Sequence, residues 1–188
     1  MASTQTNTDP VQLLTDRVDE LERRAAKAPN SDALCLVVYS GEQDRLLAAF
    51  TMATGAAASG MQVNLFFTFW ATPALRRPGT NGANKSPMER MLGWMLPGGL
   101  RGRRLSKLDF GGVGRAMMKR RMASMGIAGL PELVEIAGQL GVQITVCEMS
   151  MSLLGIAKED LIDFPNIEIA GVASFLDEAS RSATTLFI

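Results

Sequence analysis

Histidine is absent from this chain of 188 residues. Its absence excludes a histidine general base, a Ser–His or Cys–His catalytic pair, and most zinc and copper sites. Cysteine occurs only twice, at Cys35 and Cys147. Two cysteines without histidine do not build a metal site, and they do not make the disulfide framework of a small secreted domain. We therefore expect no metal and no cofactor in this protein.

A secretory signal is also missing from the first residues, which are polar from Ala2 to Asn7. Together with the low cysteine content, this predicts a cytoplasmic, reducing environment. Charge is missing between Arg45 and Arg76, and a hydropathy scan can mistake such a stretch for a membrane span. We favour a soluble segment, because its first half is rich in Ala, Thr and Gly and Ser59-Gly60 interrupts it. Peripheral membrane association is kept as a minor alternative.

Positive charge is concentrated in the middle of a chain whose formal net charge is zero. Of the 19 Lys and Arg residues, 12 fall between Arg76 and Arg121, where only 2 acidic residues occur, Glu89 and Asp109. A basic segment in a neutral protein indicates an anionic ligand, an acidic partner protein or self-association. The alternative is a solvated loop whose charges meet acidic residues elsewhere in the fold. No pattern of a nucleic-acid-binding module is present, so no nucleic-acid partner is expected.

Residues 1–30 are predicted to precede the globular domain. Residues 1–9 are expected to be disordered, and Asp9-Pro10 is typical of a helix start, with Asp as N-cap and Pro at the first helical position. An apolar stripe follows at spacings of three and four, formed by Val11, Leu14, Val18, Leu21, Ala25 and Ala28. Such a stripe fits either a short coiled coil or a helix that packs on its own subunit. Pro29-Asn30 is expected to end the helix.

Apolar runs alternate with helical patterns over residues 31–188. Strands are predicted over residues 33–40, 61–69, 142–147, 166–170 and 184–188. Helices are predicted over residues 44–58, 114–125, 130–140, 149–154, 158–161 and 171–180. This alternation predicts an α/β domain with a doubly wound, mainly parallel sheet of five strands. A basic insertion rich in Gly, Pro and Met is expected at residues 73–125, with a short helix at residues 88–95.

Cys147 ends the apolar run at residues 142–147, and the residues after it can start a helix. A cysteine at such a junction lies close to free backbone N–H groups and to the positive end of the helix dipole, and both favour the reactive thiolate. Ligands also bind beyond this edge of open parallel sheets. Cys35 lies near the start of its strand, about 10 Å or more from Cys147 along the strand direction, so no disulfide between them is expected. Cys35 is predicted to be a small buried hydrophobe, and a buried core thiol is the alternative for Cys147.

A glycine-rich sequence, Phe110-Gly111-Gly112-Val113-Gly114-Arg115, precedes a predicted basic helix. A helix start after such a turn can bind an anion. The candidates for anion binding or partner docking are Gly111, Gly112, Gly114, Arg115, Lys119 and Arg120. The spacing is not that of a dinucleotide fingerprint, and the chain has no GxxxxGK[ST] phosphate-binding loop. A hinge or a tight turn is therefore the alternative.

Five stretches look familiar together: residues 40–45 (SGEQDR), 66–70 (FFTFW), 107–118, 147–151 (CEMSM) and 171–173 (GVA). They resemble the DsrE/DsrF-like sulfur-relay family, and within it the branch labelled peroxiredoxin-like. The resemblance covers residues 33–188, and the Cys-x-Met-Ser-Met motif is its strongest part. The N-terminal helix lies outside it. The branch label does not imply peroxidase activity, and the chain lacks the Pro-x-x-x-Thr-x-x-Cys segment of true peroxiredoxins.

The resemblance implies a flavodoxin-like domain that forms homo-oligomers. It implies a cysteine that carries sulfane sulfur as a persulfide, and Cys147 corresponds to that cysteine, with Met149 and Ser150 supporting its pocket. It also implies sulfur-donor and sulfur-acceptor partner proteins, of the TusA or rhodanese type. We therefore predict a sulfurtransferase or persulfide carrier, in which a lowered thiol pKa replaces a general base. A non-catalytic oligomeric binding module is the alternative.

Overall fold

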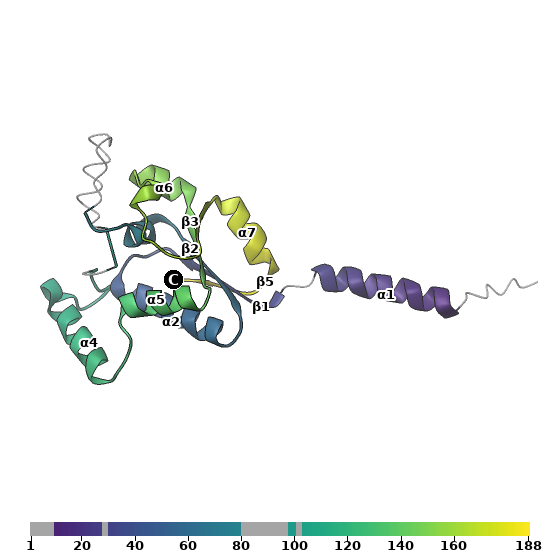
Figure 1. Ribbon diagram of the computed structural model, residues 1–188, viewed down its shortest axis with the longest axis horizontal. Coiled ribbons are helices and arrows are strands. Elements are labelled where there is room, and N and C mark those ends of the chain that lie inside the picture. Colours follow the sequence, from purple (N-terminus) through teal and green to yellow (C-terminus); the bar gives the residue numbers. More distant parts are fainter. Residues whose placement is uncertain (1–9, 28–29, 80–97, 101–102) are drawn as a thin grey trace, which may run out of the picture.

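Five parallel strands form the sheet at the centre of the protein, in the order β4-β3-β2-β1-β5 (Figure 1). The computed structural model describes residues 10–27, 30–79, 98–100 and 103–188. The strands are β1 (Asn30–Val38), β2 (Gln62–Phe67), β3 (Gln143–Cys147), β4 (Ile167–Ala170) and β5 (Ser182–Phe187). Successive strands are added on one side of β1 as far as β4, and the chain then crosses back to place β5 on the other side. The doubly wound parallel sheet of five strands predicted from the sequence is confirmed.

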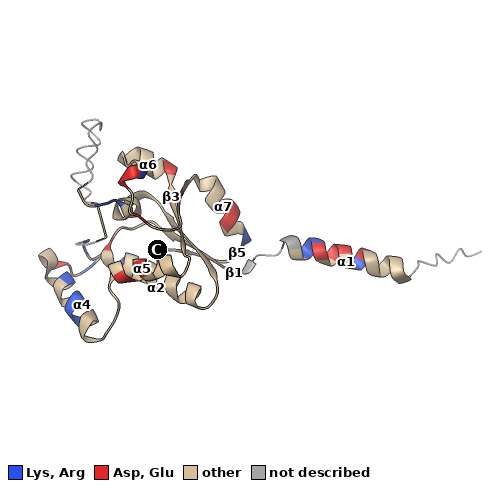
Figure 2. Ribbon diagram, viewed as in Figure 1, with Lys and Arg blue, Asp and Glu red and all other residues tan. Residues whose placement is uncertain are grey.

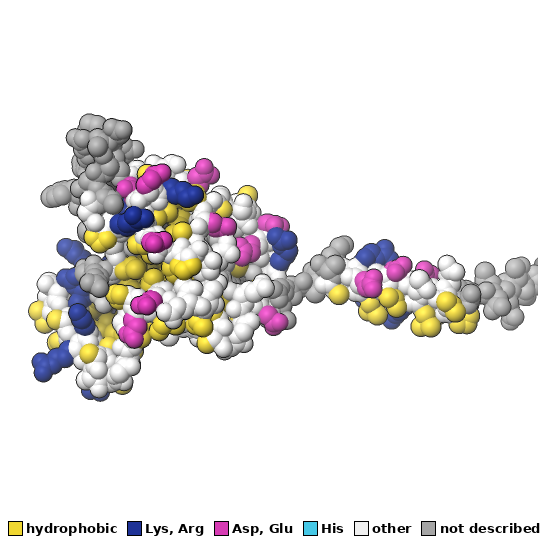
Figure 3. Space-filling model, in the orientation of Figure 1, with side chains coloured by type: hydrophobic (Ala, Val, Ile, Leu, Met, Phe, Trp, Pro, Cys, Tyr) yellow, Lys and Arg dark blue, Asp and Glu magenta, His cyan; other side chains and the backbone are white. Residues whose placement is uncertain are grey.

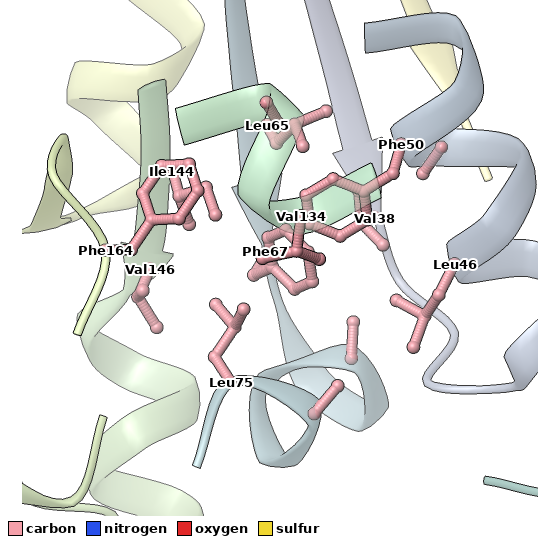
Figure 4. Packing of buried hydrophobic residues seen from close by; sticks show 14 of the residues in the cluster. Val38, Leu46, Phe50, Leu65, Phe67, Leu75, Val134, Ile144, Val146 and Phe164 are labelled. Carbon is pink, nitrogen blue, oxygen red and sulfur yellow. The ribbon is translucent and has the colours of Figure 1, made fainter. Parts of the chain in front are cut away.

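The larger core lies on the face of the sheet that is covered by α2 (Gln43–Ala58) and α5 (Leu130–Gln139). Phe50 of α2 and Phe67 of β2 are fully buried there, with ring centroids 6.1 Å apart (Figure 4). Burying a side chain of this size contributes about 1.5–3 kcal/mol relative to leaving it exposed. The charge-free stretch between Arg45 and Arg76 therefore supplies α2, β2 and the turn after β2 to this core.

No helix in the described ranges has the length and apolarity needed to cross a membrane.

The opposite face of the sheet carries α7 (Val172–Arg181) and a smaller core. Phe175 of α7 stacks on Phe66 of β2, with ring centroids 4.3 Å apart and planes inclined by 17°. Cys35 and Cys147 complete this buried cluster. Both cysteines therefore lie on the α7 face, because alternate residues of a strand point to opposite sides of the sheet.

Short elements cover the carboxyl edge of the sheet, where the parallel strands end. They are η1 (Phe69–Leu75), α6 (Glu148–Leu154) and η3 (Lys158–Asp160). The basic segment adds η2 (Phe110–Gly112) and α4 (Val113–Ser124), and the Lys and Arg residues of α4 are seen in Figure 2. This segment is attached to α2, since the Ser106 backbone N–H donates to the Asp44 carboxylate (2.9 Å) and the Gln43 N–H donates to the Arg104 carbonyl (2.9 Å). The short helix predicted at residues 88–95 lies outside the described residues.

The N-terminal helix α1 (Pro10–Lys27) stands apart from the α/β domain in Figure 1. Its predicted apolar stripe is exposed at Val11, Leu14, Val18 and Leu21. Figure 3 shows hydrophobic side chains gathered along one side of this helix. Two arrangements were predicted for the stripe. In the described part of the chain, the stripe does not pack against the protein's own α/β domain.

Candidate active site

Cys147 is both the last residue of β3 and the N-cap of α6. Its backbone is extended (φ −65°, ψ 115°), as expected of a residue that leaves a strand and enters a helix. The junction predicted from the sequence is therefore present. The Cys147 side chain is fully buried, with an exposed fraction of 0%.

Two hydroxyl groups from different elements lie beside Cys147. Register pairs Phe67 of β2 with Val146 of β3, so the next residues along the two strands, Thr68 and Cys147, are neighbours at the carboxyl edge. The Thr68 Oγ1 and Ser150 Oγ atoms are 3.0 Å apart. Ser150 Oγ also accepts the Phe69 backbone N–H at 2.9 Å. Either hydroxyl can be the donor in the contact between Thr68 and Ser150. When Thr68 is the donor, the hydrogen of Ser150 remains for donation to the sulfur of Cys147.

The environment of Cys147 favours its ionised form. Burial raises the pKa of the Cys147 thiol, but hydrogen bonds from the Ser150 hydroxyl and backbone N–H, the Thr68 hydroxyl and the Met149 backbone N–H act in the opposite direction. The balance places the pKa of Cys147 below the ordinary thiol value of 9.0. Hydrogen bonds to a charged group stabilise that form, and the thiolate is the nucleophilic state of cysteine.

Cys35 behaves in the opposite way. Burial raises the pKa of the Cys35 thiol, a hydrogen bond with Ser182 lowers it and the Glu178 carboxylate raises it, with a net increase. The Cys35 Sγ atom lies 3.0 Å from the Ser182 hydroxyl. Both cysteines are free thiols. Register places Cys35 level with Gln143, which is four residues before Cys147 and therefore about 13 Å away along the strand direction.

Backbone strain occurs next to this group, at Phe69. This residue has a positive φ of 44°, which side chains other than glycine rarely adopt. The conformation aims the Phe69 N–H at Ser150, and the Phe69 ring lies 5.7 Å from the ring of Tyr39. Non-glycine residues in this region cost about 1–3 kcal/mol and are concentrated at functional sites.

The two residues predicted to support the Cys147 pocket, Met149 and Ser150, differ in how they contribute to it. Ser150 is fully buried and takes part in the hydrogen-bonding group. The Met149 side chain is exposed, so this residue contributes through its backbone N–H. Thr68 and Phe69 were missed as site residues, although both belong to the FFTFW stretch that contributes to the family resemblance.

The glycine-rich turn is explained by its backbone geometry. Gly111 and Gly112 have positive φ angles of 65° and 102°. A Cβ atom at Gly114 would collide with the Leu108 carbonyl oxygen. The Arg115 Nε atom forms an ion pair with Asp109 at 2.8 Å. These contacts fit the tight turn that was the alternative reading of this segment.

A cavity of about 740 Å³ lies among α2, α4 and α5, and Gly112, Arg115 and Lys119 contribute to its lining. Arg120, the last of the predicted docking residues, is exposed on α4. The cavity is formed by the helices of the α2 and α5 face, whereas Cys147 packs on the α7 face. The structure therefore does not join these basic residues and Cys147 in one described cavity.

The model of the DsrE/DsrF/DrsH-like family matches residues 30–187. The chain belongs to this family. The match confirms the family resemblance seen in the sequence, and it covers the whole α/β domain, with α1 outside it. Cys147, Thr68 and Ser150 all lie within the matched residues.

Two related proteins match most of the chain. Uncharacterized protein YrkE of Bacillus subtilis is 39% identical over 153 residues, which cover 81% of this chain and 94% of that protein. Sulfur carrier protein DsrE2 of Allochromatium vinosum is 31% identical over 167 residues, which cover 82% of this chain and 97% of that protein. Among solved structures, the ychN protein from E. coli has a TM-score of 0.49 at 13% identity, covering 85% of this chain and 100% of that one.

Proposed function

We propose that this protein is a sulfur-relay protein that accepts sulfane sulfur on Cys147 as a persulfide and passes it to a partner thiol. The proposal rests on the position of Cys147 at the junction of β3 and α6, beside the paired hydroxyls of Thr68 and Ser150. Hydrogen bonds from these hydroxyls lower the pKa of the thiol although it is buried. Membership of the DsrE/DsrF/DrsH-like family supports it, as does the 31% identity with a protein named as a sulfur carrier.

Sulfur transfer then takes two displacement steps. The Cys147 thiolate attacks the outer sulfur of a donor persulfide, the donor S–S bond breaks, and the donor leaves as a thiolate. The Cys147 persulfide formed in this way keeps the proton of the outer sulfur. An acceptor thiolate attacks that outer sulfur, the new S–S bond breaks, and Cys147 leaves as a thiolate. The two steps are redox-neutral overall, so no oxidant or reductant is needed.

The hydroxyls beside Cys147 act in both steps. Ser150 and Thr68 stabilise the thiolate as nucleophile in the first step and as leaving group in the second. The buried position protects the outer sulfur of the persulfide from other thiols while it waits for its acceptor. The partners in this scheme are sulfur-donor and sulfur-acceptor proteins, of which the TusA and rhodanese types are examples.

Self-association is part of the proposal. The stripe of Val11, Leu14, Val18 and Leu21 on α1 is exposed to solvent, and a helix with such a stripe gains stability when a second apolar surface covers it. Another copy of α1 supplies a matching stripe. We expect the protein to be a homo-oligomer.

A binding role without sulfur transfer is the second candidate, and the complete burial of Cys147 favours it. Sulfur loading separates the two. The protein is treated with a stoichiometric amount of polysulfide, freed of excess reagent, and treated with cyanide, which removes sulfane sulfur as thiocyanate. Wild type and Cys35→Ser are expected to release one sulfur atom per chain, and Cys147→Ser is expected to release none. Equal release from Cys147→Ser, or no release from wild type, would leave the binding role as the better account.

A further inference from the structure

Arg76 follows η1 at the carboxyl edge of the sheet, and its side chain is 5% exposed. Backbone hydrogen bonds of the two neighbouring residues, Leu75 and Arg77, fix its position. The Arg77 N–H donates to the Asp160 carbonyl at 2.7 Å, and the Ile162 N–H donates to the Leu75 carbonyl at 2.7 Å. The arginine was counted in the sequence as part of a basic segment, but the fold places it in the interior.

Among the described residues, the guanidinium group of Arg76 lacks the partners that a buried cation normally has. Its Nε atom is buried and has no hydrogen-bond partner in the described ranges. Within those ranges no carboxylate forms an ion pair with it. Burying a charge without a partner is costly, so such a group is expected to have a ligand.

A second guanidinium group lies beside the first. The Arg103 Nε atom donates to the Gly99 carbonyl at 2.9 Å. Burial, together with the positive charge of Arg76, lowers the pKa of Arg103 to about 10. The two positive charges repel each other, and the fold nevertheless keeps the two guanidinium groups close together.

Glycines allow the chain to lie directly on both guanidinium groups. A Cβ atom at Gly98 would lie 3.0 Å from Arg76 Nε and 3.1 Å from Arg76 Cβ. A Cβ atom at Gly41 would lie 2.7 Å from Arg103 Nη1 and would collide with the Trp70 carbonyl oxygen. The residues come from three places in the sequence, since Gly41 follows β1, Arg76 follows η1, and Gly98 and Arg103 belong to the basic segment.

We propose that Arg76 and Arg103 form a binding site for a small tetrahedral oxyanion of the sulfate, thiosulfate or phosphate class. Guanidinium groups donate paired N–H bonds to the oxygens of such anions. The depth of Arg76 selects for a small ion, because a 5% exposed side chain offers little surface to a larger partner. The site goes beyond the proposed sulfur relay and does not depend on any reaction of Cys147.

Anion binding is tested on the full-length protein by calorimetric titration with sodium sulfate, phosphate and thiosulfate in chloride buffer of constant ionic strength. Wild type is expected to bind at least one of the three in a saturable manner. Arg76→Gln and Arg103→Gln are each expected to weaken that binding about tenfold or more, because each removes charge-assisted hydrogen bonds. Arg104→Gln, which changes the adjacent exposed arginine, is the matched control and is expected to leave the affinity unchanged.

Thermal unfolding separates a ligand site from a structural role. Without oxyanion, Arg76→Gln is expected to unfold at the wild-type temperature or above it, because the substitution removes an unpartnered buried charge. Oxyanion should raise the unfolding temperature of wild type and of Arg104→Gln but not that of Arg76→Gln. If Arg76→Gln does not fold, Arg76→Lys replaces it in the test. Arg76→Lys keeps the charge but lacks the planar guanidinium group, so it should bind the oxyanion more weakly than wild type. The absence of saturable binding to wild type, or equal binding to wild type and the Arg76 variants, would overturn the proposal.

Discussion

The hydroxyl oxygens of Thr68 and Ser150 lie 3.0 Å apart, beside the thiol of Cys147. Thr68 follows β2 and Ser150 belongs to α6, so the pair joins two segments that are 82 residues apart in the sequence. The N–H of Phe69, the residue after Thr68, also donates to Ser150 Oγ. A buried cysteine at the end of a strand is often an inert core thiol, and this pair of hydroxyls distinguishes Cys147 from that case.

Removal of the Ser150 hydroxyl should make Cys147 less reactive. In Ser150→Ala the thiolate loses a hydroxyl donor, so the pKa of Cys147 rises and the rate of alkylation by iodoacetamide at pH 7 falls. The curve of alkylation rate against pH should keep its shape and shift to higher pH. Ser152→Ala is the matched control, because Ser152 is exposed on the same helix. Identical pH profiles for Ser150→Ala and wild type would contradict the role given to this hydroxyl.

The two cysteines should make opposite contributions to the pH dependence of stability. The folded-state pKa of Cys147 is lowered, so its contribution is fully present above the unfolded-state pKa, near 9.0, and is lost as the pH falls through the folded-state pKa. The folded-state pKa of Cys35 is raised, so its contribution is fully present below about 9.0 and is lost as the pH rises through the folded-state pKa.

Denaturant unfolding of the two cysteine variants between pH 6 and pH 10 measures this difference. The destabilisation caused by Cys147→Ala should increase as the pH rises toward 9.0, whereas that caused by Cys35→Ala should decrease above 9.0. Parallel pH profiles for the two variants would show that the surroundings of the two thiols do not differ in the manner described.

The stack of Phe175 on Phe66 should both stabilise the fold and shield Cys147. Phe175→Ala removes a buried ring from the cluster that contains Cys147, and the expected loss in the free energy of unfolding is about 3–5 kcal/mol. Alkylation of Cys147 under native conditions should become faster. Leu176→Ala changes the neighbouring exposed side chain, and its effect should stay within about 0.5 kcal/mol. A similar loss of stability in both variants would contradict the packing described for α7.

The exposed stripe of α1 should control self-association. Leu14→Asp places a charge within the stripe, whereas Gln12→Asp places the same charge outside it. Light scattering of the full-length protein is expected to give a lower molar mass for Leu14→Asp than for wild type, and an unchanged mass for Gln12→Asp. A wild-type protein that is monomeric throughout the accessible concentration range would contradict the assembly proposed for α1.

Local patterns predicted the elements of the fold well. The apolar run that ends at Cys147 predicted β3, and the polar and apolar order after it predicted α6, because both signals lie within a few adjacent residues. Ser150 was named as a pocket residue on the family resemblance, since it belongs to the Cys-x-Met-Ser-Met motif. The turn η1 was not predicted, since the sequence pattern placed residues up to Phe69 in the strand, which ends at Phe67.

Relationships between distant segments could not be predicted in the same way. The proximity of Thr68 to Cys147 depends on the register of β2 against β3, and no local pattern encodes that register. The burial of Arg76 likewise depends on how the basic segment lies over the carboxyl edge. The residue counts predicted that this segment carries a net positive charge. They could not predict that one of its arginines, Arg76, is buried.

Sulfur loading followed by mass spectrometry tests the central claim most directly. Full-length wild type, Cys35→Ser and Cys147→Ser are incubated with a stoichiometric amount of polysulfide, and intact masses and peptide maps are recorded before and after treatment with dithiothreitol. Wild type and Cys35→Ser should gain one sulfur atom on the peptide that contains Cys147 and lose it to dithiothreitol, and Cys147→Ser should gain none. A sulfur adduct on the Cys35 peptide, or no adduct on any peptide of the wild-type protein, would contradict the assignment of Cys147 as a persulfide carrier.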